Sequence, residues 1–343
     1  MGDPSGVRSL RDLPLIDADE VARLLPYEVL VDALQAAHRL RPAMAGRTVL
    51  AAGGTDDAFL ALTAWQPGRS LGTKLVTVFP GNRTDHADGG RPSVQALYVL
   101  FDAVTGDPRA VIDGTELTYR KTAADSALGA RFLARHDVST LLVIGAGGLA
   151  PHLIAAHRAV RPSIERVLLW NRTGERAVAL ADAVGGQAVL SVERAVAEAD
   201  VVVTATMTRE PIVAGRWLRP GTHLDLVGAF RPDHREVDDD AVVRAELYVD
   251  DRTATLTEDG DLVIPMTRGL ISPADVRGDL YQLCRGDVAG RTDPAAITLF
   301  ENGGGGHLDL MTADVVWERF NDPAGGTGRG RRSGTPRTGD MLT

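Results

Sequence analysis

The sequence predicts an α/β protein, and three features of one central stretch support this prediction. Leu141–Ile144 is a short, wholly apolar run, as expected for a strand buried in a parallel sheet. Gly-Ala-Gly-Gly-Leu-Ala follows at 145–150, and a helix-like run over 152–160 leads to a second apolar run over 167–170. This is a β-α-β unit with a G-x-G-x-x-A turn, which is typical of a Rossmann-type dinucleotide-binding domain.

The turn has small residues where a dinucleotide requires them. Gly145 allows the tight turn, Gly147 leaves room for a pyrophosphate, and Ala150 keeps the helix close to the sheet. The free amide groups at the start of that helix then face the phosphates. An ordinary strand-to-helix turn is the alternative, and the complete β-α-β unit argues against it.

The end of the second strand indicates which dinucleotide is bound. A cofactor without a 2′-phosphate usually meets an acid at this point, but here the sequence is Asn171-Arg172-Thr173. An arginine between two small polar residues suits a phosphate, so NADPH is favoured over NADH. Alternatively, Arg172 is a solvated surface charge.

Composition sets the class of protein. The 343 residues are 44% hydrophobic and 24% charged, which is ordinary for a globular protein with room for two cores. The net charge of −9 argues against nucleic acid as a partner, and the single Cys284 excludes an internal disulfide. There is no apolar run of transmembrane length and no signal-peptide pattern, so we expect a cytoplasmic protein without a membrane partner.

The residues before the β-α-β unit predict an α+β part. Two helical runs cover 16–25 and 27–40, and the apolar and alternating runs that follow predict strands. These strands are expected at 47–51, 58–64, 73–79, 94–102 and 108–113.

A long helix over 115–135 should carry the chain into the dinucleotide-binding domain. Beyond it, the alternation of helices and strands continues, with a weaker strand expected near Ile264. Residues 295–320 suggest a last helical segment interrupted by Gly303–Gly306, and 323–343 have the composition of a disordered tail. The expected strands are 188–190, 200–205, 222–227 and 245–249, and the expected helices are 173–184 and 192–198.

A few charged side chains could carry chemistry. Lys74 lies within an apolar strand, where it is either an exposed strand lysine or a proton donor at a cleft. Arg47 and the Arg120-Lys121 pair could anchor a carboxylate, or they could be solvated. Asp309, among apolar neighbours, could accept from a substrate amine or be a surface acid. The eight histidines lack metal-ligand spacing, so no metal is expected.

Several motifs together resemble the ornithine cyclodeaminase/μ-crystallin family over about residues 15 to 320. They read TKLVTVFPGN at 73–82, PSVQALYVLFDAVTG at 92–106, LTYRKTAADSALGARFL at 117–133, IGAGGLA at 144–150, WNRT at 170–173, VGAFRPDHREVDDD at 227–240 and LFENGGGGHLDL at 299–310.

The resemblance implies a homodimer and a small-molecule imino-acid substrate bound beside a nicotinamide. It implies a substrate-binding and dimerisation domain over 1–122, to which 300–322 return, and a Rossmann domain over 123–299. By position it implies catalytic roles for Lys74 and Asp309. The substrate-binding positions are Arg47, Asn82, Lys121, Asn302 and Gly303. The cofactor-binding positions, including those of the glycine turn, are Ser93, Thr122, Gly145, Gly147, Gly148, Leu149, Ala150, Asn171, Arg172, Thr173, Thr206, Val227, Gly228 and Phe230.

Three departures from the family pattern bear on the reaction. Phe230 stands where cyclodeaminases have the proton-transferring aspartate, and the branch with Phe or Ser there resembles ketimine and Δ1-pyrroline-2-carboxylate reductases. Lys121 replaces the carboxylate-binding arginine, and Asn302 replaces the serine of a late Ser-x-Gly motif. We therefore expect an NADPH-dependent reductase of a cyclic imino acid. The alternatives are a cyclodeaminase-type lyase, an amino-acid dehydrogenase, and a non-catalytic NADPH-dependent binding protein.

Overall fold

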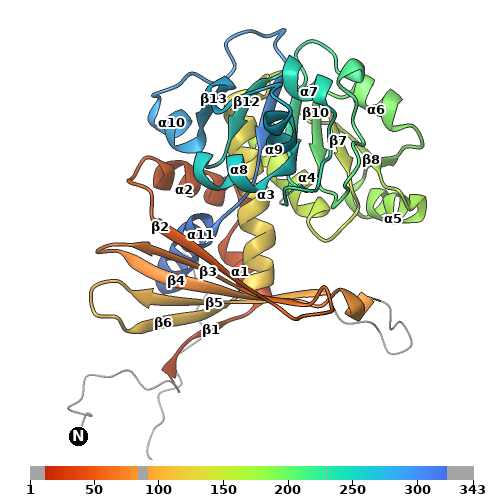
Figure 1. The fold of residues 1–343 in the computed structure, drawn as a ribbon. Coiled ribbons are helices and arrows are strands. Elements are labelled where there is room, and N and C mark those ends of the chain that lie inside the picture. Colours follow the sequence, from red (N-terminus) through yellow and green to blue (C-terminus); the bar gives the residue numbers. More distant parts are fainter. Residues whose placement is uncertain (1–11, 84–91, 230, 323–343) are drawn as a thin grey trace, which may run out of the picture.

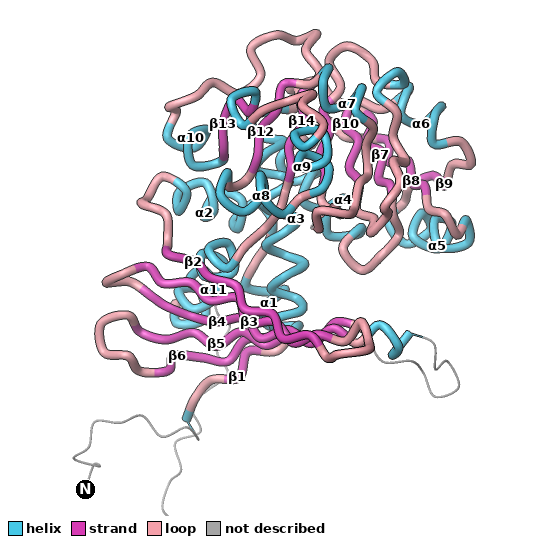
Figure 2. The backbone as a smooth tube through the Cα atoms, viewed as in Figure 1, coloured by secondary structure: helices cyan, strands magenta, loops and turns pink. Residues whose placement is uncertain are grey.

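The computed structural model describes residues 12–83, 92–229 and 231–322. Phe230 and the tail expected at 323–343 lie outside these residues. The chain forms two sheets joined by one long helix (Figures 1 and 2). The fold class predicted from the sequence is confirmed.

The first sheet has six strands in the order β1-β6-β5-β4-β3-β2 and is antiparallel except for the β1–β6 pair. Side chains alternate between its two faces, and helices cover one of them (Figure 1). The elements of this part are β1 Leu15–Ile16, α1 Ala18–Leu24, α2 Tyr27–His38, β2 Met44–Ala51, β3 Ala58–Gln66, β4 Ser70–Val78, the 3-10 turn η2 Pro80–Arg83, β5 Val94–Asp102 and β6 Pro108–Asp113.

The second sheet has eight parallel strands in the order β13-β12-β14-β11-β10-β7-β8-β9. From β7 the strand order runs in opposite directions to β8 and to β10, and such a switch point is where open α/β sheets bind ligands. Its elements are β7 Thr140–Ile144, α4 Ala150–Val160, β8 Arg166–Trp170, α5 Gly174–Val184, β9 Gln187–Ala188, α6 Val192–Glu198, β10 Val201–Thr204, η4 Gly215–Trp217, β11 His223–Leu226, α7 Asp239–Arg244, β12 Glu246–Val249, α8 Arg252–Glu258, α9 Gly260–Thr267, η5 Pro273–Asp275, β13 Val276–Asp279, α10 Leu280–Arg285 and β14 Thr298–Glu301.

Helix α3, Gly114–Leu133, connects the two sheets (Figure 1). Its first turn is capped by Asp113, whose side chain accepts a hydrogen bond from the Glu116 amide at 2.7 Å. The helix packs closely at both ends. A Cβ on Gly114 would lie 2.7 Å from the Ala96 carbonyl carbon, and one on Gly129 would lie 2.7 Å from the Phe300 ring. Both sheets are thus held against the same helix.

Two expectations for the last third of the chain are wrong. The segment near Ile264 is helix α9 rather than a strand. Thr298–Glu301 is not helical but forms β14, a fully buried strand between β11 and β12. A run of four residues can be buried as either element, and only the neighbouring strands decide which. After β14, the chain passes through the glycines into α11, Gly306–Asn321, which packs on the first sheet (Figure 2).

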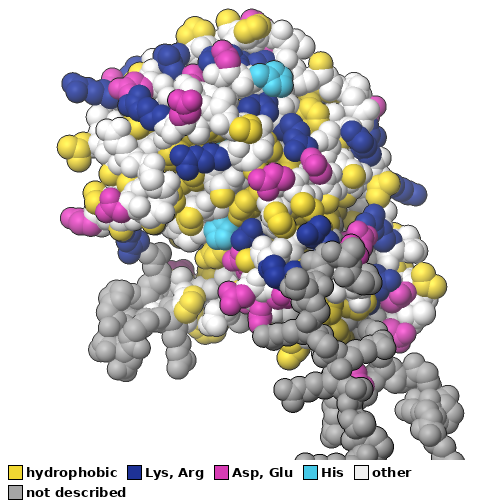
Figure 3. Space-filling view, turned by 180° about the vertical axis from the view of Figure 1, so that it is seen from behind, with side chains coloured by type: hydrophobic (Ala, Val, Ile, Leu, Met, Phe, Trp, Pro, Cys, Tyr) yellow, Lys and Arg dark blue, Asp and Glu magenta, His cyan; other side chains and the backbone are white. Residues whose placement is uncertain are grey.

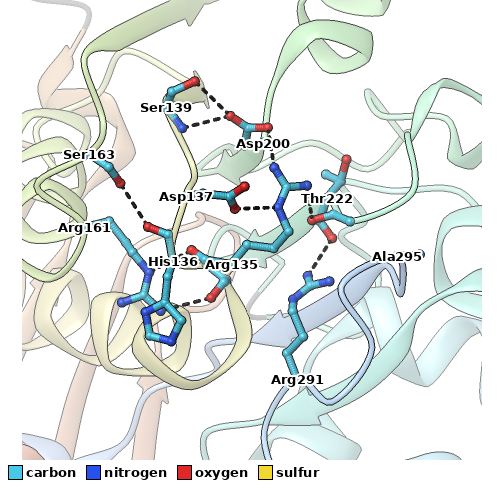
Figure 4. Close-up of polar contacts among 12 residues, drawn as sticks. Arg135, His136, Asp137, Ser139, Arg161, Ser163, Asp200, Thr222, Arg291 and Ala295 are labelled. Carbon is cyan, nitrogen blue, oxygen red and sulfur yellow. Dashed lines mark hydrogen bonds and ion pairs between the residues drawn. The ribbon is translucent and has the colours of Figure 1, made fainter.

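The end of α3 is held by an arginine from another element. Arg161, which follows α4, donates from Nη2 to the carbonyls of Ala130, Arg131 and Ala134 at 2.8–3.0 Å, and from Nε to the Arg135 carbonyl at 3.0 Å. Figure 4 shows its place beside the Arg135–Asp200 ion pair. The last carbonyls of a helix lack intrahelical partners, so a buried cation here satisfies several of them.

Replacing this cap should destabilise the whole fold. Arg161→Met leaves the buried carbonyls without donors, so we expect the free energy of unfolding to fall by about 2–4 kcal/mol. Urea denaturation followed by circular dichroism measures the change. Arg166→Met is the matched control, because Arg166 pairs with Glu198 on the surface, and its effect should stay within about 0.5 kcal/mol. Equal effects of the two variants would contradict the capping role.

Candidate active site

One row of side chains crosses the first sheet on its helix-covered face. Arg47 is opposite Leu62 in the β2–β3 register, Leu62 is opposite Lys74, and Lys74 is opposite Tyr98. Directly opposite residues point to the same face, so Arg47 and Lys74 share a face two strands apart, roughly 10 Å. Lys74 is 5% exposed, so the alternative of a surface lysine is wrong.

A buried ion cluster lies on this row. Asp309 Oδ1 accepts a hydrogen bond from Lys74 Nζ at 3.0 Å and lies 3.3 Å from Lys121 Nζ. The three residues come from β4, α3 and α11, and all three are buried. Lys74 and Lys121 are the only two lysines in the sequence, and its other strongly basic side chains are all arginines. Asp309, which is 0% exposed, is therefore not a surface acid.

Local contacts fix the two lysines. The Thr118 hydroxyl donates to the Gly114 carbonyl at 2.6 Å, so its oxygen is free to accept from Lys74 Nζ at 3.2 Å. Lys121 Nζ also donates to the Gly305 carbonyl at 3.4 Å. The cluster also holds a buried carboxylate oxygen, Asp309 Oδ2, that receives no hydrogen bond from the described residues.

The charges of the cluster oppose the effect of burial. Burial lowers the pKa of Lys74, Asp309 raises it and Lys121 lowers it, and together they bring this pKa to about 8. Burial would raise the pKa of Asp309, but the two lysines outweigh it, so this pKa lies below its ordinary value. At neutral pH Asp309 is thus ionised, and Lys74 can lose its proton within an accessible pH range.

A glycine loop separates this cluster from a pocket of about 520 Å³. Gly304 has φ +71°, and a Cβ there would lie 3.2 Å from Lys121 Nζ. At Gly303 a Cβ would lie 2.3 Å from Asp259 Oδ2. Side chains in the loop would thus displace the lysine or the acid. The pocket is lined by Pro42, Ala43, Ala45, Gly46, Arg47, Leu62, Asp251, Thr253, Ala254, Thr257, Glu258, Asp259, Tyr281 and Gly303–His307.

Arg47 lies in this pocket wall and is partly exposed. Its guanidinium forms an ion pair of 2.5 Å with Glu258 at the end of α8. The pair joins the first sheet to the second across the pocket. Because both side chains are reached by solvent, the pair contributes little to stability, and the guanidinium can exchange partners.

Asn302 is held by a buried polar network. Its Nδ2 donates to the Thr122 carbonyl and to Ser126 Oγ, both at 3.0 Å. Ser126 Oγ in turn donates to Asp225 Oδ1 at 3.0 Å, and His157 Nε2 lies 3.4 Å from the other oxygen of Asp225. A carbonyl can only accept, so the network fixes which way the Asn302 amide points.

The dinucleotide turn has the geometry that its sequence predicts. Gly145 has φ +117°, and a Cβ there would lie 2.5 Å from the Ala205 carbonyl oxygen, so only glycine fits. A Cβ on Gly147 would meet no protein atom within 4 Å, which leaves space over the start of α4. Gly148 lies against the Tyr119 hydroxyl, and Leu149 is the residue before Ala150, where α4 begins.

The residues after β8 are also arranged around this turn. Asn171 Oδ1 accepts from the Ala146 amide at 3.2 Å, and Asn171 Nδ2 donates to the Thr173 carbonyl at 2.9 Å. Arg172 is exposed, so its guanidinium is available. Open space at the helix start, the exposed Arg172 and the absence of an acid at 171–173, directly after β8, together fit an NAD(P) dinucleotide.

The sequence reasoning missed one acid at the carboxyl edge of the second sheet. Glu236 is completely buried, and its oxygens accept four hydrogen bonds of 2.6–2.7 Å. The donors are the Thr204 hydroxyl, the amide and hydroxyl of Thr206, and the amide of Gly228. Val227, before Gly228, is also buried. The surrounding motif is polar and irregular, so its sequence gave no signal that this acid is buried.

Some expected site residues are not brought to the lysine cluster. Asn82 lies in η2, where its Nδ2 donates to the Pro92 carbonyl at 3.3 Å. Ser93 accepts from the Phe79 amide at the same end of β4 and β5, beyond Val78. Both are well along the strands from Lys74. Phe230, the position that bears most on the reaction class, lies outside the described residues.

Comparisons with known proteins identify the family of this chain. The sequence model of the ornithine cyclodeaminase/mu-crystallin family matches residues 18–323. The chain is 42% identical over 297 residues to a Delta(1)-pyrroline-2-carboxylate reductase of Paracoccus denitrificans, covering 85% of this chain and 92% of the relative. The protein therefore belongs to the ornithine cyclodeaminase/mu-crystallin family, as the resemblance predicted.

Solved structures share the whole fold. Delta(1)-pyrroline-2-carboxylate reductase of Thermococcus litoralis, in complex with NADH and L-proline, superposes with a TM-score of 0.83 at 30% identity, covering 89% of this chain and 97% of the other. An archaeal alanine dehydrogenase dimer with bound NAD superposes with a TM-score of 0.79 at 30% identity, covering 89% and 95%.

Acidic and basic side chains are interspersed on the face drawn in Figure 3. Within the described ranges, no group of three or more His, Cys, Asp or Glu side chains could hold a metal ion. In the same ranges, no helix has the length and apolar character needed to cross a membrane.

The lowered pKa of Lys74 predicts how stability changes with pH. Between pH about 8 and about 10.4 the unfolded chain binds more protons at this lysine than the folded chain does. The free energy of unfolding of the wild type should therefore rise with pH relative to that of Lys74→Met, by on the order of 3 kcal/mol at most. Urea denaturation of both proteins at pH 7.5 and 10.5 measures the difference. A pH-independent difference would show that Lys74 titrates normally.

Proposed function

We propose that this protein is an NADPH-dependent reductase that converts a cyclic α-imino carboxylate, such as Δ1-pyrroline-2-carboxylate or Δ1-piperideine-2-carboxylate, into the cyclic amino acid. The observation that carries the proposal is the buried Lys74–Asp309–Lys121 cluster beside the pocket wall. It offers a titratable donor, a cation for a carboxylate and an unused acceptor within one site. Two of the relatives named above are Delta(1)-pyrroline-2-carboxylate reductases, which supports the choice of substrate.

The proposed roles follow from charge and position. The bound dinucleotide would supply the hydride. Lys74, with its pKa of about 8, would protonate or keep protonated the imine nitrogen, which makes the imine carbon a better electrophile. Asp309 Oδ2 would accept from the N–H of the resulting iminium.

The carboxylate of the substrate would be held by cations. Arg47 lies on the same sheet face as Lys74 and can leave its exposed pair with Glu258. Lys121 would add a second positive charge, although its ammonium lacks the two-pronged geometry of an arginine. Asn302 and Gly303, at the start of the glycine loop, would bound the substrate on the other side. Fixing the carboxylate also fixes which imine face meets the hydride.

Other activities fit this chain less well. A cyclodeaminase of this family needs a proton-transferring aspartate where this chain has Phe230, which cannot transfer a proton. Amino-acid dehydrogenation is the alternative on the same scaffold, since it would reverse the same kind of hydride step on an open-chain substrate. A pure binding protein has no need for a buried, titratable lysine held by an ionised acid.

We also propose a homodimer formed through the first sheet. Its uncovered face carries large apolar side chains, namely Met44, Leu50, Phe59, Trp65 and Leu97, which are 39–62% exposed. The register places Met44 opposite Trp65 and Leu50 opposite Phe59, so these side chains form one surface. Exposed apolar patches of this kind mark association sites. A dimeric alanine dehydrogenase with the same fold supports this. The division into 1–122 with 300–322, and 123–299, stays a proposal.

Turnover of cyclic imino acids tests the reaction directly. Purified protein with NADPH should consume Δ1-pyrroline-2-carboxylate or Δ1-piperideine-2-carboxylate, measured by loss of absorbance at the NADPH band. Lys74→Met should lower kcat by about 10²-fold or more, the scale of a lost general acid, while NADPH still binds. Unchanged turnover in Lys74→Met would make Lys74 structural. Release of ammonia and proline from ornithine by the wild type would overturn the reductase assignment.

The preference for NADPH is tested at Arg172. Arg172→Ala should weaken NADPH binding by about 1.5–3 kcal/mol, because a charged hydrogen bond to the 2′-phosphate is lost, and NADH binding should hardly change. Fluorescence titration with each dinucleotide measures both constants. Arg166→Ala, an exposed arginine at the other end of β8, is the control and should affect neither. Equal use of NADH and NADPH by the wild type would refute the preference.

A further inference from the structure

We propose that Glu236 is a positioning residue that shapes the nicotinamide end of the dinucleotide crevice and places a negative charge behind it. The inference rests on the proposed function, because it requires that a nicotinamide dinucleotide lies at the carboxyl edge of the second sheet. Glu236 itself lies beneath that edge and is 0% exposed.

One carboxylate joins two adjacent strand ends. Oε1 accepts from the Thr206 amide and hydroxyl, both at 2.6 Å, and thus holds the loop after β10. Oε2 accepts from the Gly228 amide and the Thr204 hydroxyl, both at 2.7 Å, and thus also holds the loop after β11. The two loops therefore cannot move apart without breaking hydrogen bonds to the same side chain.

The loops are in direct contact as a result. A Cβ on Gly228 would lie 1.7 Å from the Thr206 carbonyl oxygen and 2.6 Å from Glu236 Oε1, so no larger residue fits. Thr206 and Gly228 are the positions expected to line the cofactor. Their spacing, and hence the width of the crevice wall, is set by a residue that does not reach the crevice itself.

Hydrogen bonds also hold the backbone of Glu236. Asp261 Oδ1 accepts from the amides of Glu236 and Val237, both at 2.9 Å. The Glu236 carbonyl accepts from the Ile212 and Val213 amides at 2.8 and 3.0 Å. Because hydrogen bonds hold both the backbone and the carboxylate of Glu236, the carboxylate has little freedom to move. A residue that positions the crevice wall must be fixed in this way.

Burial raises the pKa of Glu236 above its ordinary value, while the hydrogen bonds from Thr206, Thr204 and Gly228 lower it. All four donors therefore favour the ionised form against the effect of burial. Transfer of a hydride from the reduced nicotinamide leaves a positive charge on the ring. A fixed negative charge behind that ring therefore favours the oxidised product over the reduced reactant.

The test compares Glu236→Gln with the wild type by dinucleotide binding, without turnover. The amide keeps the shape, but it loses the charge and turns its own N–H groups toward donors. We expect the Kd for NADPH, from fluorescence titration, to rise about fivefold or more. The Kd for NADP⁺, from displacement of NADPH, should rise by a larger factor, so the ratio of the two constants changes. A purely structural role would not move that ratio.

Two further variants keep the test decisive. Thr204→Val removes one of the four donors, and it should give an intermediate rise in both constants even if Glu236→Gln does not fold. Asp314→Asn is the control, because Asp314 is a buried acid that accepts from Ser70 in the other half of the molecule. It should lower the unfolding temperature and leave both Kd values unchanged.

The outcomes separate this proposal from the proposed reaction. If Glu236→Gln folds and binds both dinucleotides as tightly as the wild type does, the positioning role is overturned, whatever the effect on stability. If Glu236→Gln does not fold, unchanged affinities in Thr204→Val overturn it. A constant NADP⁺-to-NADPH ratio would overturn the role of the charge. A wild type that binds NADPH but reduces no imino acid would overturn the reaction and leave the positioning result standing. A wild type that binds neither dinucleotide would overturn both.

Discussion

The ion cluster of Asp309 with the two lysines constrains the structure more than any other contact. Two ammonium groups are rarely buried, because each loses its hydration, and they stay charged only if an acid lies in contact with both. That acid is on α11, near the end of the described chain, while the lysines are on β4 and α3. The chain must therefore return from the second sheet to the first. The glycines before α11 allow it to do so while one of their carbonyls accepts from Lys121.

Helix α3 ties this cluster to the dinucleotide-binding sheet. It carries Lys121 and Thr118 toward the first sheet, and its last residues are capped by Arg161 from the second part. Between them, the Thr122 carbonyl and Ser126 hold Asn302 at the start of the glycine loop. The proposed proton donor and the proposed hydride site are thus attached to one rigid element. Alignment of the two to within fractions of an ångström is what a concerted reduction requires.

The sequence predicted the parts that rest on local patterns. The β-α-β unit, strands β2 to β6 of the first sheet and the long helix α3 were expected within a few residues, since their periodicity and glycine positions are local. Strand β1 was not expected, because its two residues stand at the start of a predicted helical run. Strand β14 was missed because the four residues Thr298–Glu301, close to a glycine run, do not reveal that β11 and β12 lie on either side. The burial of Lys74 was left open for the same reason, because its partner is 235 positions away.

Buried acids were the hardest feature to anticipate. Glu236 lies in a polar stretch that resembles a surface loop, and its four donors come from two strand ends that meet only in the folded sheet. Asn302 was noted as a departure, but its network through Ser126 to Asp225 required the contacts of α3 and β11. In each case the sequence shows the residue type, but it does not show the hydrogen-bond partners that are brought together only in the folded protein.

The choice of lysine at both cationic positions has a physical rationale. An arginine cannot lose its proton in the accessible pH range, whereas burial brings the pKa of Lys74 to about 8. An arginine at position 121 could also bind both oxygens of Asp309 with its planar fork. The two lysines instead share Oδ1, and Oδ2 keeps its lone pairs. Lysine at position 121 therefore leaves one oxygen of Asp309 without a donor among the described residues, as the proposed contact with an iminium N–H requires.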